Sequence, residues 1–162
     1  MKLFHGTIHE FTVPDPSRGR IGTDFGAGFY LTDSERMADD WLNGEENKHV
    51  NIYELTLSEI SSCSLHIRRY ETASIEWAKF VYNNRRARKS SNRYDIIIGP
   101  LVDNSLNRWF SKIDDNSITW EELAEKIEFR KYSSLQFCFK TQKSVKLSAP
   151  RPITGCSIAL SI

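Results

Sequence analysis

The sequence predicts an α+β protein built as a single domain. Short apolar runs of strand character, such as YDIII at residues 94–98, recur along the chain. Stretches with helical spacing of apolar residues lie early and in the middle of the chain. The length of 162 residues fits one domain that buries a core without disulfides or metal.

The first elements are expected to be a strand over residues 1–7, a turn-rich stretch over 11–22 and a strand over 29–32. Prolines and glycines interrupt the stretch between the two strands. Asp33 or Ser34 then caps a short helix, in which apolar residues recur at helical spacing.

The later part of the chain is expected to hold two helices and three strands. They are the helices 73–83 and 120–127 and the strands 50–57, 94–98 and 135–141. The last strand reads LQFCFKT, and its Leu, Phe and Phe alternate with Gln136, Cys138 and Lys140. This alternation predicts a half-buried strand whose second face carries those three residues. After Val145, prolines favour a loop.

Composition and motifs exclude several classes of function. The net charge of +1 identifies no partner, and the N-terminus lacks the apolar run of a signal peptide. No stretch approaches the roughly 20 apolar residues of a membrane span. Three separated cysteines argue against a disulfide framework or a cysteine zinc site. We therefore expect a cytoplasmic protein with no membrane association and no metal. P-loop, Rossmann and nucleophile-elbow motifs are missing.

The segment DFGAGFYLT, residues 24–32, places two glycines directly before an aromatic pair. Gly26 and Gly28 permit a sharp turn and a close approach of a ligand to the backbone. Tyr30 then either projects its ring into a cleft or packs in the core, and the pattern alone favours the core.

Three separated motifs resemble the ADP-ribosyltransferase superfamily, in the branch with a His-Tyr-Glu signature that includes diphtheria toxin and the poly(ADP-ribose) polymerases. They are His5-Gly6 near the end of the first strand, GAGFYLT before a helix, and Gln136 in the late strand. Over residues 3–147 the chain is also similar to a family of small bacterial proteins known as a domain of unknown function. The shared segments are DFGAGFYLT, VNIYEL, EWAKFVYNNR, YDIIIGPLVDN and QFCFKT. Members of that family are regarded as ADP-ribosyltransferases, some encoded beside small partner genes like toxin–antitoxin pairs.

The resemblance implies a split antiparallel sheet with flanking helices over residues 1–148, followed by a C-terminal extension over 149–162. It also implies NAD⁺ as a co-substrate. Nicotinamide leaves, and ADP-ribose passes to a macromolecular acceptor, either a protein or a nucleic acid. The bond would break with oxocarbenium character, as in glycoside hydrolysis. We expect a toxin-like mono-ADP-ribosyltransferase with a small antitoxin as a partner.

The same resemblance assigns roles in NAD⁺ binding. His5 would bind the adenosine ribose, and the backbone of Gly6 would meet the nicotinamide carboxamide. Tyr30 and Trp41 would sandwich the nicotinamide ring by offset stacking. Gly28 would help to clear space for the dinucleotide. For His5 and Trp41 the alternatives are a core histidine bonded to backbone and a core residue of the helix.

Gln136, the third residue of the catalytic signature with His5 and Tyr30, departs from the pattern because the polymerases carry glutamate there. Glutamine cannot act as a base or carry charge, so chain elongation is not expected. Asp24 or Asp103 would then supply a carboxylate. Ala38, in the helix, stands where the polymerases often have a serine that binds the carboxamide.

Basic residues suggest two further contacts. Arg20 is expected to face the pyrophosphate, since guanidinium matches phosphate oxygens. The run NNRRARKSSNR over residues 83–93 would contact nucleic acid or an acidic protein, but it has no interleaved aromatic residues and also fits a solvated helix end. Three functions stay open: ADP-ribosyl transfer, with NAD⁺ hydrolysis as a variant; NAD⁺ or ADP-ribose binding without catalysis; and nucleic-acid binding.

Overall fold

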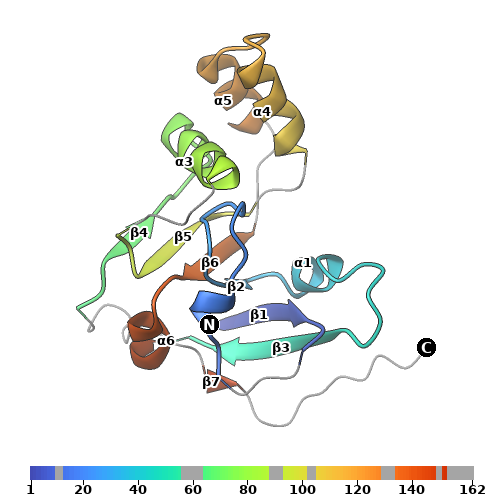
Figure 1. Ribbon diagram of the computed structural model, residues 1–162, viewed down its shortest axis with the longest axis vertical. Helices are drawn as coiled ribbons and strands as arrows, with labels where there is room; N and C mark the ends of the chain where they lie inside the picture. The colour runs from blue at the N-terminus through green and yellow to red at the C-terminus, as the bar shows by residue number, and fades with distance from the viewer. Residues whose placement is uncertain are drawn as a thin grey trace.

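In the part of the chain that the structure describes, a mostly antiparallel sheet is flanked by five α-helices, which confirms the predicted α+β class (Figure 1). The computed structural model describes residues 1–9, 13–55, 64–87, 93–101, 105–128, 134–148 and 151–152. Within these ranges, no helix has the length and apolar character needed to cross a membrane.

The elements follow the chain in a mixed order. The strands are β1 (Lys2–Thr7), β2 (Phe29–Thr32), β3 (His49–Glu54), β4 (Ile67–Arg69), β5 (Ile96–Pro100), β6 (Leu135–Phe139) and β7 (Arg151–Pro152). The helices are α1 (Glu35–Asp40), α3 (Ile75–Arg86), α4 (Leu106–Asp114), α5 (Trp120–Glu128) and α6 (Gln142–Ser148), with the 3-10 helix η1 (Pro16–Arg18). The sheet order is β4-β5-β6-β2-β1-β3-β7; β4 and β5 pair in parallel, and the other described pairs are antiparallel.

Serine side chains start two of the helices, as capping rules predict. The Ser34 hydroxyl accepts a hydrogen bond from the N–H of Met37 at the start of α1. At the start of α3, the Ser74 hydroxyl accepts from the N–H of Trp77. α1 ends at Asp40, so the residues that follow it lie just beyond the helix.

Several elements differ from the sequence predictions. β4 and α4 were not predicted, and α6 together with β7 replaces the loop expected after Val145 in the described residues. β6 is not half-buried: Gln136 is 3% exposed and Cys138 is 0% exposed. The prediction of an exposed second face on this strand was wrong, because both faces of the sheet are covered.

Two hydrophobic cores lie on opposite faces of the sheet. On β5, Ile97 belongs to the core beneath α3, α4 and α5, together with Phe25 of the loop before β2. Its neighbours Ile96 and Ile98 belong to the other core, which includes Val145 of α6. This alternation is the period of two expected of a strand covered on both sides. Figure 1 shows α3, α4 and α5 gathered at one end of the molecule and α6 toward the other.

The sheet is split between β1 and β2. β1 forms six residue pairs with β3, from Lys2↔Glu54 to Thr7↔His49. With β2 it pairs at Phe4↔Thr32 alone. A continued antiparallel ladder would pair Gly6 with Tyr30. The two strands that carry the first two motifs therefore part at the motif residues themselves.

Candidate functional site

His5 lies where β1 and β2 part. Its Nδ1 is 2.7 Å from the carbonyl oxygen of Tyr30, so a side chain connects the strands where their ladder has ended. An Nδ1–H that donates to this carbonyl leaves the lone pair on Nε2 in the neutral ring. Burial lowers the pKa of His5, and the bond to Tyr30 opposes that shift less strongly. The neutral imidazole is therefore the favoured form at pH 7.

The Tyr30 hydroxyl turns back onto the loop that precedes β2. It donates to the carbonyl oxygen of Gly26 at 2.6 Å, accepts from the N–H of Phe25 at 3.0 Å and lies 2.9 Å from the Thr23 hydroxyl. The ring is partly buried against the core that contains Cys138. Burial is the main cause that raises the pKa of Tyr30 well above its ordinary value. The neutral phenol thus clamps the loop of residues 23–26.

A chain of polar side chains runs from β6 through this loop to α3. Gln136 donates from Nε2 to Asp24 Oδ2 at 2.8 Å and to the carbonyl of Pro100 at 3.2 Å. Asp24 Oδ1 accepts from Arg85 Nε at 2.6 Å, and Arg85 Nη1 donates to Asn107 Oδ1 at 2.7 Å. An amide at position 136 suits this place, because a glutamate would set a second carboxylate against Asp24.

The loop of residues 23–26 connects Tyr30 and Gln136, whereas His5 contacts the backbone carbonyl of Tyr30 from the other face of the sheet. Tyr30 and Gln136 lie on the same face of the sheet, since Gln136 pairs with Thr32, two residues along β2 from Tyr30. The His5 ring packs instead against Phe29, at 4.6 Å between centroids. Phe29 belongs to the core on the other face.

Protein atoms occupy the place of a side chain at two of the predicted cofactor-binding glycines. A Cβ on Gly6 would lie 2.1 Å from the carbonyl oxygen of Ala38 in α1. A Cβ on Gly28 would lie 2.5 Å from Cys138 Sγ and 2.8 Å from the Phe139 carbonyl oxygen. Close packing against α1 and β6 therefore requires glycine at both positions, independently of any ligand.

Trp41 and Arg20 are exposed. Trp41 follows α1 directly and is 41% exposed, so the alternative of a core tryptophan is wrong. The Arg20 backbone carbonyl accepts a hydrogen bond from Thr23 at 3.3 Å, and its side chain makes no hydrogen bond or ion pair with any described residue. Asp103, the alternative carboxylate to Asp24, lies outside the described residues.

Two arginines of the basic run over residues 83–93 form ion pairs within the protein. The side chains of Arg85 and Asp24 form an ion pair and are each 11% exposed. Arg86 pairs with Asp114, and its guanidinium lies 4.0 Å from the centroid of the Tyr82 ring. Residues 88–92 lie outside the described part of the chain. The Asp24–Arg85 pair was missed at the sequence level because 61 positions separate its members and no local pattern links them.

The fold and this loop define a class: an α+β domain whose sheet opens between its first two strands, beside a loop held by polar contacts of tyrosine, glutamine and arginine. The chain belongs to the family described as "Protein of unknown function (DUF3990)", which matches residues 1–148. No curated protein and no solved structure matches the chain. Its activity must therefore be argued from the site.

Proposed function

We propose that this protein is a mono-ADP-ribosyltransferase that transfers ADP-ribose from NAD⁺ to a macromolecular acceptor and releases nicotinamide. The observation that carries the proposal is the strand order β6-β2-β1 around a split in the sheet. Three motifs that are distant in sequence fall on these three adjacent strands: Gln136 on β6, Tyr30 on β2 and His5 on β1. The resemblance of the same motifs to ADP-ribosyltransferases supplies the chemistry.

The proposed ligand contacts depend on the tautomer of His5 and on the exposure of Trp41. A neutral His5 with its lone pair on Nε2 accepts a hydrogen bond from a ribose hydroxyl. Trp41, exposed next to α1, offers an indole face to the nicotinamide ring, and such stacking contributes about 0.5–1.5 kcal/mol. Tyr30 supports the site by holding the loop of residues 23–26 in place.

In the proposed reaction the bond between nicotinamide nitrogen and ribose carbon breaks. Its electron pair goes to the nicotinamide ring, which leaves neutral, and positive charge develops on the ribose. The acceptor nucleophile bonds to that carbon and releases its proton to solvent. Asp24, which Gln136 and Arg85 hold in place, is the carboxylate we assign to offset the developing charge. Because Gln136 is uncharged, a single transfer is expected rather than chain growth.

The test combines labelled NAD⁺ with the full chain and with bacterial proteins and nucleic acids in separate reactions. The wild type should release nicotinamide and label a macromolecule, and Trp41→Ala should reduce both at least about tenfold, since truncation removes a stacking partner and part of the orientation of the ring. Ile67→Ala, a change at another exposed apolar residue, on the far edge strand β4, is the matched control and should stay active. Absence of nicotinamide release by the wild type would reject the proposal.

A second candidate is an NAD⁺-binding module without catalysis. It is favoured by Gln136, whose amide nitrogen is already bonded to Asp24 and Pro100 and is buried. Calorimetry that shows NAD⁺ bound and recovered intact would support this candidate over transfer. Nicotinamide release without any labelled acceptor would instead identify an NAD⁺ glycohydrolase. A toxin-like role and an antitoxin partner, implied by the family resemblance, stay predictions.

A further inference from the structure

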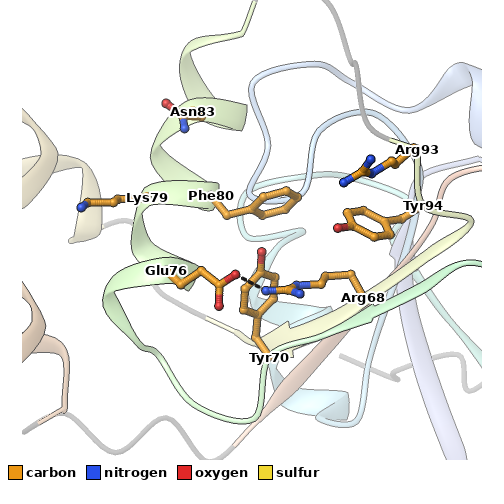
Figure 2. A pocket seen from close by; sticks show the side chains of 8 residues that line it. All are labelled: Arg68, Tyr70, Glu76, Lys79, Phe80, Asn83, Arg93 and Tyr94. Atoms are coloured by element: carbon orange, nitrogen blue, oxygen red, sulfur yellow. Dashed lines mark hydrogen bonds and ion pairs between the residues drawn. The ribbon is translucent and has the colours of Figure 1, made fainter.

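A cavity of about 460 Å³ opens between β4, α3 and the residues that lead into β5 (Figure 2). None of the residues predicted to bind NAD⁺ lines it. Both ends of the basic run of residues 83–93 do, through Asn83 and Arg93. The cavity is therefore a feature separate from the signature residues, and it joins the basic run to a different part of the chain.

Three aromatic side chains form the cavity wall. Tyr70 is 6% exposed and packs against Phe80, with 5.5 Å between ring centroids. Phe80 and Tyr94 are partly exposed, so their rings reach the open side. Phe80 also contacts Phe25 of the loop before β2, at 6.2 Å between centroids. The wall is thus packed against the core, and the fold supplies the aromatic residues that the basic run itself lacks.

Two of the three cations around the cavity already contact other side chains. Arg68 pairs with the lining residue Glu76, and its guanidinium lies 4.8 Å from the centroid of the Tyr70 ring. Lys79 points away from the aromatic group in Figure 2 and lies 5.4 Å from the Trp120 ring centroid.

Arg93 is the third cation of the cavity lining. It is exposed, and Figure 2 shows its guanidinium extending toward Phe80 beside Tyr94. It makes no hydrogen bond or ion pair with any residue that the structure describes. An exposed guanidinium beside two partly exposed aromatic side chains is an arrangement suited to an anion attached to a flat aromatic group.

We propose that this cavity binds one nucleotide unit of a single-stranded nucleic acid. The base stacks on Tyr94 or Phe80, and Arg93 holds the adjoining phosphate. Proteins that bind single strands combine stacking on aromatic rings with cationic contacts to the backbone, and the volume lies within the range of small-molecule sites. An acidic protein would use the charge but not the rings, so the aromatic wall favours nucleic acid. The proposal concerns binding alone and holds whether or not the chain transfers ADP-ribose.

The test is fluorescence anisotropy with labelled single-stranded DNA and RNA of about 12 nucleotides, within the site sizes of known single-strand binders, in the absence of NAD⁺. Arg93→Glu and Tyr94→Ala should each weaken binding about tenfold or more. Arg108→Glu is the matched charge control, because Arg108 is exposed on α4 and does not line the cavity. It should stay closer to the wild type than Arg93→Glu. Tyr94→Phe keeps the ring, and it should bind like the wild type.

Other outcomes would overturn the proposal. They are failure of the wild type to bind either strand, or equal weakening by Arg93→Glu and Arg108→Glu. Binding that Tyr94→Ala leaves unchanged and that polyglutamate displaces would indicate an acidic protein partner instead. Displacement of the strand by equimolar AMP would indicate a free-nucleotide site and reject the polynucleotide. Circular dichroism of each variant separates lost binding from lost folding, and Arg93→Gln replaces Arg93→Glu if the charge reversal unfolds the chain.

Discussion

Strand β1 is held in two different ways by its two neighbours. Toward β3 it forms a regular ladder of six residue pairs, and toward β2 it forms one. On the β2 side, side-chain hydrogen bonds replace the backbone ladder. His5 bonds to the Tyr30 carbonyl, and the loop before β2 is held by the Tyr30 hydroxyl and by Gln136. A backbone ladder accepts many side chains, whereas a side-chain hydrogen bond requires a particular one. The β2 side is therefore where the sequence is most constrained.

The largest effect is expected when the polar chain on the β2 side is broken. Asp24→Asn removes the charge that faces Arg85, and both side chains are 11% exposed. Removing one partner of a buried ion pair costs about 3–5 kcal/mol, so the free energy of unfolding should fall by about 3 kcal/mol. Denaturant titration measures it. The control is Asp40→Asn, which breaks an exposed pair with Arg36 and should cost less than about 0.5 kcal/mol. Equal losses in the two variants would show that the buried Asp24–Arg85 pair contributes no more to the free energy of unfolding than an exposed ion pair does.

Tyr30→Phe should give the next largest effect. It removes the hydroxyl that accepts from the N–H of Phe25 and leaves that donor unsatisfied. Such a loss costs about 1–3 kcal/mol, measurable as a lower midpoint of thermal unfolding. Tyr82→Phe, which removes a hydroxyl bonded to Asp114 at the surface, is the control and should cost less. A larger loss for Tyr82→Phe would contradict the clamp assigned to Tyr30.

The contribution of His5 on the β2 side is expected to make stability depend on pH. Its folded-state pKa is depressed below 6.5, so its neutral form contributes stability above that pH. This contribution is lost as the pH falls through the folded-state pKa, because the unfolded state binds the proton first. The wild type should therefore lose stability relative to His5→Gln as the pH falls below about 6.5. The carboxylates common to both proteins cancel in the difference. A difference that does not change with pH would mean that His5 titrates alike in both states.

The smallest effect is expected on the β3 side. His49 is exposed and pairs with Thr7 through the backbone ladder. His49→Ala leaves those backbone groups in place, so the free energy of unfolding should change by no more than about 0.5 kcal/mol. Chemical denaturation of this variant beside Tyr30→Phe compares the two sides directly, and a similar loss in both would remove the distinction between them.

Periodic apolar patterns and caps predicted much of the fold. The strand over 29–32 was confirmed, as was the start of α1 at its serine cap. β4 was missed because it has three residues, two of them arginine, and shows no alternation to detect. α4 was missed although Leu106 and Phe110, both buried, have helical spacing that signals one face of a helix.

The site was less accessible to prediction than the fold. The motif residues proved to lie on adjacent strands, but their contacts depend on segments far apart in the chain. Gln136 was expected on an exposed strand face, and it is buried because distant helices cover that face. The hydroxyl of Tyr30 bonds to Gly26, four residues earlier, so this contact is local. Sequence alone does not distinguish such a clamp from a ring that faces a ligand.

The hydrogen bond between Gln136 and Asp24 couples the two positions in any redesign. Gln136→Glu alone adds a second negative group at this bond, and Asp24→Asn alone strips the counter-ion from Arg85. Making both changes preserves the total charge and keeps one amide facing one carboxylate, while the negative charge moves from the loop to β6. A reciprocal exchange of this kind should be less damaging than the sum of its two halves, which a double-mutant cycle measures. Glutamate on the strand, the arrangement of the polymerases, is thus two coordinated substitutions away rather than one.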